Sequence, residues 1–181
     1  LPDSDRVELT MNLKKKQRLI LWIRKPDWAD KATLIINGKA EQLLLGNDGY
    51  WMIDKVWNRK NRISLQLPMH TYTENLIGTG RYVALLYGPY VLAGRMGKEN
   101  LPSTFWGKMN NTAMNKMDLS KVPVFNIPAT QIPDHVEPVF ERGTLRFNIH
   151  LKGFENVVLE PFYKIHFEPY AIYWPTASSN E

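Results

Sequence analysis

The chain has 181 residues, no cysteine and a net charge of +5. At about 150 residues per domain, this length predicts one large domain or two small ones. Without cysteine, the chain itself can hold no disulfide, no thiolate metal site and no cysteine nucleophile. Hydrophobic residues make up 44% and charged residues 23%, which is typical of a globular protein and not of a disordered one.

The positive charge is concentrated near the start of the chain, in a run formed by Lys14, Lys15, Lys16, Arg18, Arg24 and Lys25. We interpret this run as a solvated turn between two strands. No nucleic-acid-binding motif accompanies it, so we expect no nucleic acid partner. The longest apolar runs, residues 19–23 and 83–87, are shorter than the roughly 20 residues that span a bilayer, so we expect no membrane partner.

Alternating apolar and polar residues predict a series of short strands in the first half of the chain. These strands are expected at residues 7–13, 19–24, 34–36, 50–53, 63–67, 81–87 and 90–93. The segment 19–24 differs from the others because it is apolar on both faces. Asn37-Gly38 and Gly88-Pro89 are typical of tight turns between strands.

The character of the chain changes after residue 95, where Asn, Lys, Met and Gly become frequent. Prolines then recur at positions 123, 128, 133 and 138, and strand patterns resume at 145–151, 157–159 and 162–174. We therefore predict a module at 1–95, an irregular linker or surface excursion at 96–118, and a second, smaller β module at 119–181. The fold class is all-β, with antiparallel β-sandwich (jelly-roll-like) modules and little or no helix.

Few residues suggest catalysis. The carboxylates of Glu160 and Glu168 flank an aromatic segment that contains His166, and they are the best acid–base candidates in the chain. We interpret all three as packing or hydrogen-bonding residues. His150 lies at a polar position of an alternating strand and is expected to be exposed. The sequence therefore predicts no catalytic, cofactor-binding or metal-binding residue in this chain.

Aromatic residues are the one unusual enrichment of the chain, with six tryptophans, eight tyrosines and seven phenylalanines. Exposed aromatic rings suit carbohydrate binding because sugars present apolar C–H faces. Trp22, Trp51 and Trp174 lie in predicted strands and are expected in the core or between domains. No strand accounts for Trp106. Trp106 and Trp51 are the two candidates for contact with carbohydrate or with a neighbouring domain.

Several segments, taken in order, resemble motifs of the bacterial β-L-arabinofuranosidases of glycoside hydrolase family 127 (GH127). Residues 21–29 (LWIRKPDWA) resemble the LRIPxWA stretch that follows the catalytic barrel of that family. The other matches are IING at 35–38, GYW at 49–51 with Trp57, LQLPM at 65–69, RYVALLYGPYV at 81–91, PFYKIH at 161–166 and YAIYWP at 170–175. The resemblance covers most of 7–94 and 157–175, and the closing motif is similar to that of larger relatives common in Bacteroidetes.

The resemblance implies β-sandwich modules attached to an (α/α)6 helical barrel. In GH127, the catalytic glutamate and the zinc-bound cysteine nucleophile belong to that barrel, so no catalytic residue carries over to this chain. The sequence departs from the family motifs at Lys25 and Tyr87. These departures leave the sugar specificity of the parent enzyme unassigned.

We therefore expect the non-catalytic C-terminal region of a secreted glycoside hydrolase that acts on arabinofuranosides or related plant glycans. Its expected partner is the helical barrel of the parent chain, with a glycan or a second copy as further partners. No cofactor is expected, and the resemblance alone implies a periplasmic or extracellular location. The alternatives are an autonomous carbohydrate-binding module and an oligomerisation module, which glycan affinity and the oligomeric state would distinguish.

Overall fold

The computed structural model describes residues 4–46, 48–78, 80–96, 122–141, 144–166 and 168–177. Contacts divide the chain into two compact units, Leu1–His70 (unit 1) and Thr71–Glu181 (unit 2). Antiparallel strands form nearly all the regular structure, and the helical segments of the described ranges are the 3-10 turns η2 and η3. The prediction of an all-β antiparallel fold with little helix is confirmed. No helix among the described residues is long and apolar enough to cross a membrane.

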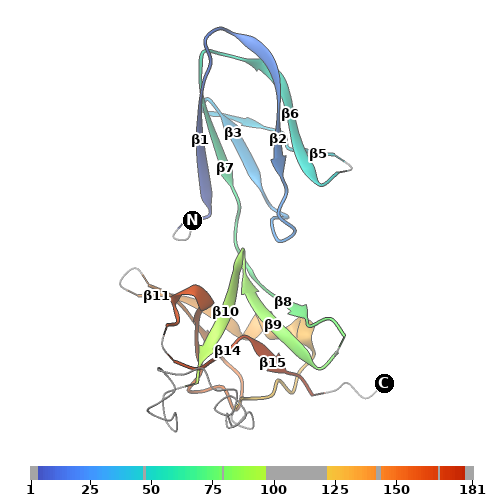
Figure 1. The fold of residues 1–181 in the computed structure, drawn as a ribbon, viewed down its shortest axis with the longest axis vertical. Coiled ribbons are helices and arrows are strands. Elements are labelled where there is room, and N and C mark those ends of the chain that lie inside the picture. Colours follow the sequence, from blue (N-terminus) through green and yellow to red (C-terminus); the bar gives the residue numbers. More distant parts are fainter. Residues whose placement is uncertain are drawn as a thin grey trace, which may run out of the picture. The chain divides into compact units, whose positions relative to one another are not determined.

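Unit 1 is a two-layer sandwich, drawn in blue to green in Figure 1. One sheet has the order β1-β7-β3-β4 and the other the order β2-β6-β5. The strands are β1 (Arg6–Asn12), β2 (Gln17–Arg24), β3 (Thr33–Ile36), β4 (Lys39–Glu41), β5 (Leu44–Leu45), β6 (Tyr50–Trp57) and β7 (Lys60–Gln66). Both sheets contribute to one core, which includes Leu34 and Ile63 from the first sheet and Ile53 from the second.

The alternation of side chains on β6 decides which face of its sheet is buried. Trp51, Ile53 and Trp57 occupy every second or fourth position and are buried in the core of unit 1. The Trp57 ring also donates a hydrogen bond from Nε1 to the carbonyl oxygen of Leu19 at 2.9 Å, so its polar atom is satisfied inside the core.

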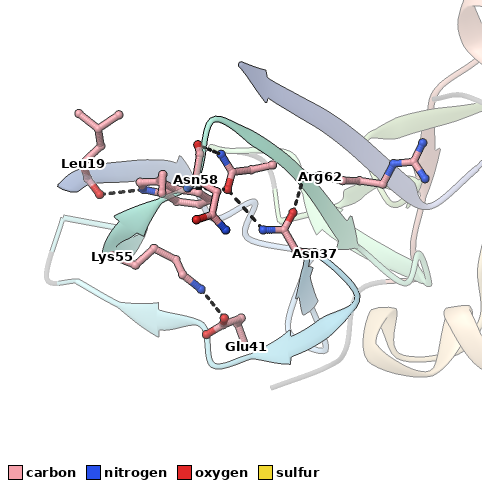
Figure 2. A network of polar contacts seen from close by, with 8 residues as sticks. Leu19, Asn37, Glu41, Lys55, Asn58 and Arg62 are labelled. Carbon is pink, nitrogen blue, oxygen red and sulfur yellow. Dashed lines mark hydrogen bonds and ion pairs between the residues drawn. The ribbon is translucent and has the colours of Figure 1, made fainter. Parts of the chain in front are cut away.

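Polar side chains join the β3–β4 turn to the β6–β7 turn at one end of unit 1 (Figure 2). The Asn61 amide donates to the Asn58 carbonyl at 2.7 Å, and its oxygen accepts from the Asn58 N–H at 3.1 Å and from Asn37 Nδ2 at 3.3 Å. Asn37 lies in the β3–β4 turn with φ 51°, which asparagine tolerates better than most residues. Its oxygen accepts a hydrogen bond from the Arg62 N–H at 2.8 Å. The β3–β4 turn is therefore bound to the β6–β7 turn, which is one of the connections between the two sheets.

An ion pair crosses between the same two sheets. Lys55 on β6 contacts Glu41 on β4, and the Lys55 ammonium also lies 5.9 Å from the centre of the Trp57 ring. Both charged side chains are about one-third exposed, so solvent screens the pair and it contributes little to stability.

Unit 2 is built on one eight-stranded antiparallel sheet with the order β11-β12-β13-β10-β9-β15. The other two of its eight strands lie off this path: β8 also pairs with β9, and β14 also pairs with β10. The elements are β8 (Thr71–Asn75), β9 (Tyr82–Tyr87), β10 (Tyr90–Arg95), η2 (Ala129–His135), β11 (Val136–Glu141), β12 (Thr144–Ile149), β13 (Val158–Pro161), η3 (Phe162–Lys164), β14 (Tyr170–Ala171) and β15 (Tyr173–Pro175).

An aromatic cluster lies at the centre of the unit 2 core. Phe125 stacks on Phe154 with ring centroids 4.3 Å apart, and both rings contact Trp174. Gly94 on β10 lies directly against Trp174: a Cβ atom at residue 94 would be 2.5 Å from Cη2 of the indole. Only glycine lets the indole approach the strand this closely.

The structure and the sequence divide the chain at different places. The sequence predicts a module that ends at residue 95, whereas the contacts divide the chain after His70. The reason is pairing: β8, β9 and β10 belong to the same sheet as the strands of 136–175. Most of the predicted linker, residues 97–118, lies outside the described residues.

The proline-rich stretch 123–138 contains more ordered structure than the sequence predicts. Phe125 and Ile132 are fully buried, and Pro138 lies within β11, opposite Phe147 of β12. Proline is tolerated there because β11 is an edge strand, so one side of its backbone needs no ladder partner.

The contact between Gly94 and Trp174 gives a first prediction. We expect Gly94→Ala to destabilise unit 2 by about 2 kcal/mol, because the added methyl group overpacks a rigid, buried ring. Differential scanning calorimetry measures the change. In the matched control, Gly46→Ala, the added methyl meets Asp48 Oδ1, an exposed atom that can move away at the cost of its 3.2 Å hydrogen bond from the Tyr50 N–H, so we expect a smaller effect. Equal destabilisation by the two substitutions would contradict this account.

The asparagine network gives a second prediction. Asn61 is 3% exposed and makes three hydrogen bonds, so Asn61→Ala removes them and takes away the side-chain partners of the Asn58 N–H and carbonyl and of Asn37. We expect a loss of about 2 kcal/mol, measured by denaturant unfolding. Asn12→Ala, at an exposed position at the end of β1, is the control and should change stability by less than about 0.5 kcal/mol.

Candidate functional site

The tryptophans noted in the sequence that the structure describes lie either in a core or at the surface. Trp51 on β6 is 4% exposed and lies in the core of unit 1, and Trp174 on β15 is fully buried in unit 2. Trp22 on β2 is 48% exposed and is not part of a core. Trp51 therefore has no free face on which a sugar could stack. Trp106 lies outside the described residues.

Glu160 and Glu168, the carboxylates noted in the sequence, are brought together by an arginine. Arg95 Nη2 lies 2.6 Å from Glu160 Oε2, and the same guanidinium forms an ion pair with Glu168. On its other side, Glu160 Oε1 accepts a hydrogen bond from Arg146 Nε at 2.9 Å. One buried carboxylate is thus held between two guanidinium groups.

Strand register places these groups on one face of the unit 2 sheet. Ala93 pairs with Glu160 and Asn148 pairs with Val158, which brings Arg95 on β10 and Arg146 on β12 to either side of Glu160 on β13. The core side chains of the same strands, such as Leu92, point to the opposite face. Sequence analysis missed both arginines, although Arg146 lies at an outward position of the strand predicted at 145–151.

The arginines determine the charge of Glu160. Its burial favours the neutral acid, but the hydrogen bonds and charges of Arg95 and Arg146 outweigh burial and lower the pKa of Glu160 below its ordinary value of 4.5. A general acid for glycoside hydrolysis needs the opposite shift, so that it still carries its proton near neutral pH. Glu160 is therefore a structural anion.

The other titratable candidates are placed at the surface. His150 is exposed, as the sequence predicts, and its Nε2 lies 3.0 Å from Glu137 Oε2, while His166 is also exposed. Within the ranges that the structure describes, no group of three or more His, Asp or Glu side chains is arranged to hold a metal ion.

A groove of about 480 Å³ lies in unit 2. Its walls are mostly apolar and are formed by Val124, Asn126, Ile127, Leu151, Lys152, Gly153 and Phe154. Asn126 and Lys152 can donate hydrogen bonds to a ligand, but these lining residues include no carboxylate. The groove therefore lacks the acid–base pair that glycosidic bond cleavage requires.

The most unusual surface is the outward side of the β2-β6-β5 sheet in unit 1. Residues that alternate with the core positions point outward here: Arg18, Ile20, Trp22 and Arg24 on β2, Tyr50, Met52, Asp54 and Val56 on β6, and Leu44 on β5. We call this set the outer β2-β6-β5 face. Ile20, Trp22 and Val56 are each about half exposed. An outward face of an antiparallel sheet is usually polar, so this one is a candidate contact surface.

Two family models match consecutive parts of the chain. The model described as "Beta-L-arabinofuranosidase, GH127 middle domain" matches residues 1–69. The model DUF4986, described as "Domain of unknown function", matches residues 72–176, which is more than half of the chain. The GH127 resemblance noted in the sequence is confirmed for residues 1–69, and the junction of the two models coincides with the boundary of units 1 and 2.

Solved structures contain the same fold. A GH127 β-L-arabinofuranosidase from Geobacillus stearothermophilus T6 matches with a TM-score of 0.66 and 16% identity, over 97% of this chain and 29% of that chain. A protein titled as a glycoside hydrolase matches with a TM-score of 0.60 and 15% identity, over 98% of this chain and 31% of that chain. A GH127 β-arabinofuranosidase matches with a TM-score of 0.55 and 14% identity, over 97% and 30%.

The chain spans less than a third of the length of each of these structures. At these identities the likeness shows the fold. No curated protein sequence matches the chain.

The Glu160 cluster predicts a pH-dependent stability. Because folding lowers the pKa of Glu160, the cluster stabilises the fold fully above about pH 4.5, and this stabilisation is lost as the pH falls through the lowered pKa. Glu160→Gln should therefore destabilise the protein at pH 7 by about 2 kcal/mol, since charged hydrogen bonds to both arginines are weakened. The difference from wild type should shrink as the pH falls below 4.5.

The measurement is thermal unfolding of both proteins between pH 7 and pH 3. Glu137→Gln is the matched control, because Glu137 is exposed and pairs only with the exposed His150 among the described residues. It should leave stability nearly unchanged at pH 7. A Glu160→Gln effect of the same size at pH 7 and at pH 3 would rule out the ion pairs as its cause.

Proposed function

The chain belongs to the DUF4986 family, and on that premise we propose that it is the non-catalytic, C-terminal β region of a larger glycoside hydrolase. The observation that carries the proposal is the order of its parts. A unit that matches the GH127 middle domain is followed directly by the DUF4986 unit, and the fold of both together recurs within a GH127 enzyme that is more than three times as long.

The described residues support a non-catalytic role. Glu160 and Glu168 are both engaged by Arg95, and Glu160 is held ionised by a second arginine. A carboxylate in this state can neither donate a proton to a leaving group nor reach a sugar from its buried position. The hydrolytic groups would therefore come from another part of the polypeptide, which we propose to be an (α/α)6 helical barrel.

The substrate class is inferred from the relatives. Two of the similar structures are titled as β-arabinofuranosidases, so we propose that the parent enzyme acts on arabinofuranosides or on related linkages of plant glycans. A secreted enzyme in the periplasm or outside the cell would meet such polymers. The β region would pack against the barrel and support the rim of its active site.

Hydrolysis assays test this proposal. The full-length product of the gene should hydrolyse aryl arabinofuranosides, whereas the 181-residue chain alone should show no turnover above the buffer rate. Glu160→Gln in the full-length protein should keep its kcat at a temperature where the protein is folded, because the residue is structural. Turnover by the isolated chain, or loss of kcat in folded Glu160→Gln, would refute the non-catalytic assignment.

Glycan binding is tested separately. Affinity electrophoresis of the chain on arabinan and on pectic glycans should show no retardation if its role is to support the barrel. The Trp106→Ala variant is the control. Retardation of the wild type that disappears in this variant would instead identify an autonomous carbohydrate-binding module.

A further inference from the structure

The outer β2-β6-β5 face has the composition of a protein interface. Six of its nine side chains are apolar or aromatic, namely Ile20, Trp22, Leu44, Tyr50, Met52 and Val56. Its charged residues are Arg18, Arg24 and Asp54, and it contains no lysine and no glutamate. Enrichment in aromatic residues, Met and Arg, with depletion of Lys and Glu, is typical of the buried part of interfaces between proteins.

The arrangement of these residues is equally informative. Trp22, Met52 and Leu44 lie side by side in one row across the three strands, and Tyr50 is the next outward residue on β6. Arg18 forms a two-pronged ion pair with Asp54, with both N–O distances 2.8 Å, so these two charges are already matched. Within the described part of the chain, no carboxylate pairs with Arg24. The centre of the face is apolar, and one positive charge lies at its end.

A sugar would find few partners on this face. Carbohydrate sites combine an aromatic platform with polar groups that bind the hydroxyls. Here the outward neighbours of Trp22 are Ile20 and Arg24 on β2 and Met52 on β6, with Tyr50 diagonally opposite. The carboxylate of Asp54 is occupied by Arg18, so the polar groups left for a sugar are the Arg24 guanidinium and the Tyr50 hydroxyl. The chemistry of the face therefore favours a protein surface over a glycan.

The size of the face favours a partner in the same polypeptide. Two strands of eight residues at about 3.3 Å each, with the two-residue strand β5 beside them at a spacing of about 4.8 Å, give a face of at most roughly 14 Å by 26 Å, or about 370 Å². A stable complex of separate proteins buries about 800 Å² on each partner, roughly twice as much. Contacts between domains of one chain are smaller, because a covalent link keeps the two surfaces at high effective concentration.

We infer that the outer β2-β6-β5 face docks onto an apolar surface of the catalytic domain of the same polypeptide, with a carboxylate of that domain placed against Arg24. This inference rests on the proposed function, since it requires the larger hydrolase. It identifies which side of unit 1 is covered in the complete enzyme. It also explains why β2 is apolar on both faces.

Hydroxyl-radical footprinting of the full-length gene product tests the inference, with Trp51 as the internal reference for Trp22. Both residues are tryptophans of unit 1, so their intrinsic reactivities cancel. In this chain their exposures are 48% and 4%, a twelvefold difference. At a concentration where light scattering shows a monomer, docking should bring the oxidation rate of Trp22 to within about twofold of that of Trp51. A Trp22 rate about twelvefold higher would overturn the inference.

The same footprinting experiment, repeated at higher protein concentration and with added arabinan, distinguishes two other partners for this face. Protection of Trp22 that appears only at concentrations where the protein dimerises would assign the face to a second copy. Protection that appears only when arabinan is added would assign it to a glycan. Either result overturns docking within the polypeptide.

Substitution gives an independent measurement. Trp22→Lys in the full-length protein should lower its Tm by several degrees, whereas Phe140→Lys, at a residue of β11 that is 70% exposed, should have little effect. Equal Tm values for Trp22→Lys and wild type would contradict docking.

The inference and the proposed function fail in different ways. A gene product that is no longer than this chain, or that is longer but hydrolyses no glycoside, contradicts the proposed function. A longer and hydrolytic product in which Trp22 reacts like an exposed residue contradicts only the docking.

Discussion

Side chains alternate between the two faces of a sheet, and this constraint shapes both units. A strand that is apolar at consecutive positions needs cover on both sides. On β2, Leu21 and Ile23 are on the side of the unit 1 core, while Ile20 and Trp22 are on the opposite side and are about half exposed. The first pair obtains its cover from the β1-β7-β3-β4 sheet. The second pair has no such cover among the residues that the structure describes.

In the sheet of unit 2, charged side chains occupy the face opposite the core. Its core face carries the Phe125, Phe154 and Trp174 cluster, whereas its other face carries Arg95, Arg146 and Glu160. Because each carboxylate oxygen of Glu160 has a guanidinium partner, the cost of burying the charge is largely offset by hydrogen bonds. The two units thus differ in kind: one outward face is held by matched charges, and the other is apolar.

The strands that alternate strictly could be predicted from the sequence, and those with weak patterns could not. Ile63 and Leu65, like Leu145 and Phe147, identified β7 and β12 because each pair lies on one buried face. β8 (sequence TYTEN) was missed because it contains no aliphatic residue, and β11 because Pro138 indicated little capacity for strand pairing. The Glu160 site shows the same limit. Its carboxylate was visible in the sequence, but Arg95 is 65 residues away and only strand pairing reveals the contact.

The distribution of satisfied and unsatisfied groups separates a supporting region from a catalytic one. An active site keeps polar groups whose pKa values or hydrogen bonds are unsatisfied until the substrate or transition state arrives. In this chain Asp54, Glu160 and Asn61 are fully engaged by neighbouring groups. Trp174 Nε1 is buried without a hydrogen-bond partner among the described residues, but an indole N–H performs no proton transfer near neutral pH. The larger unsatisfied feature is the apolar surface around Trp22. Burial of this exposed apolar area would stabilise association with another surface, but apolar groups perform no proton transfer. The surface is therefore suited to docking and not to catalysis.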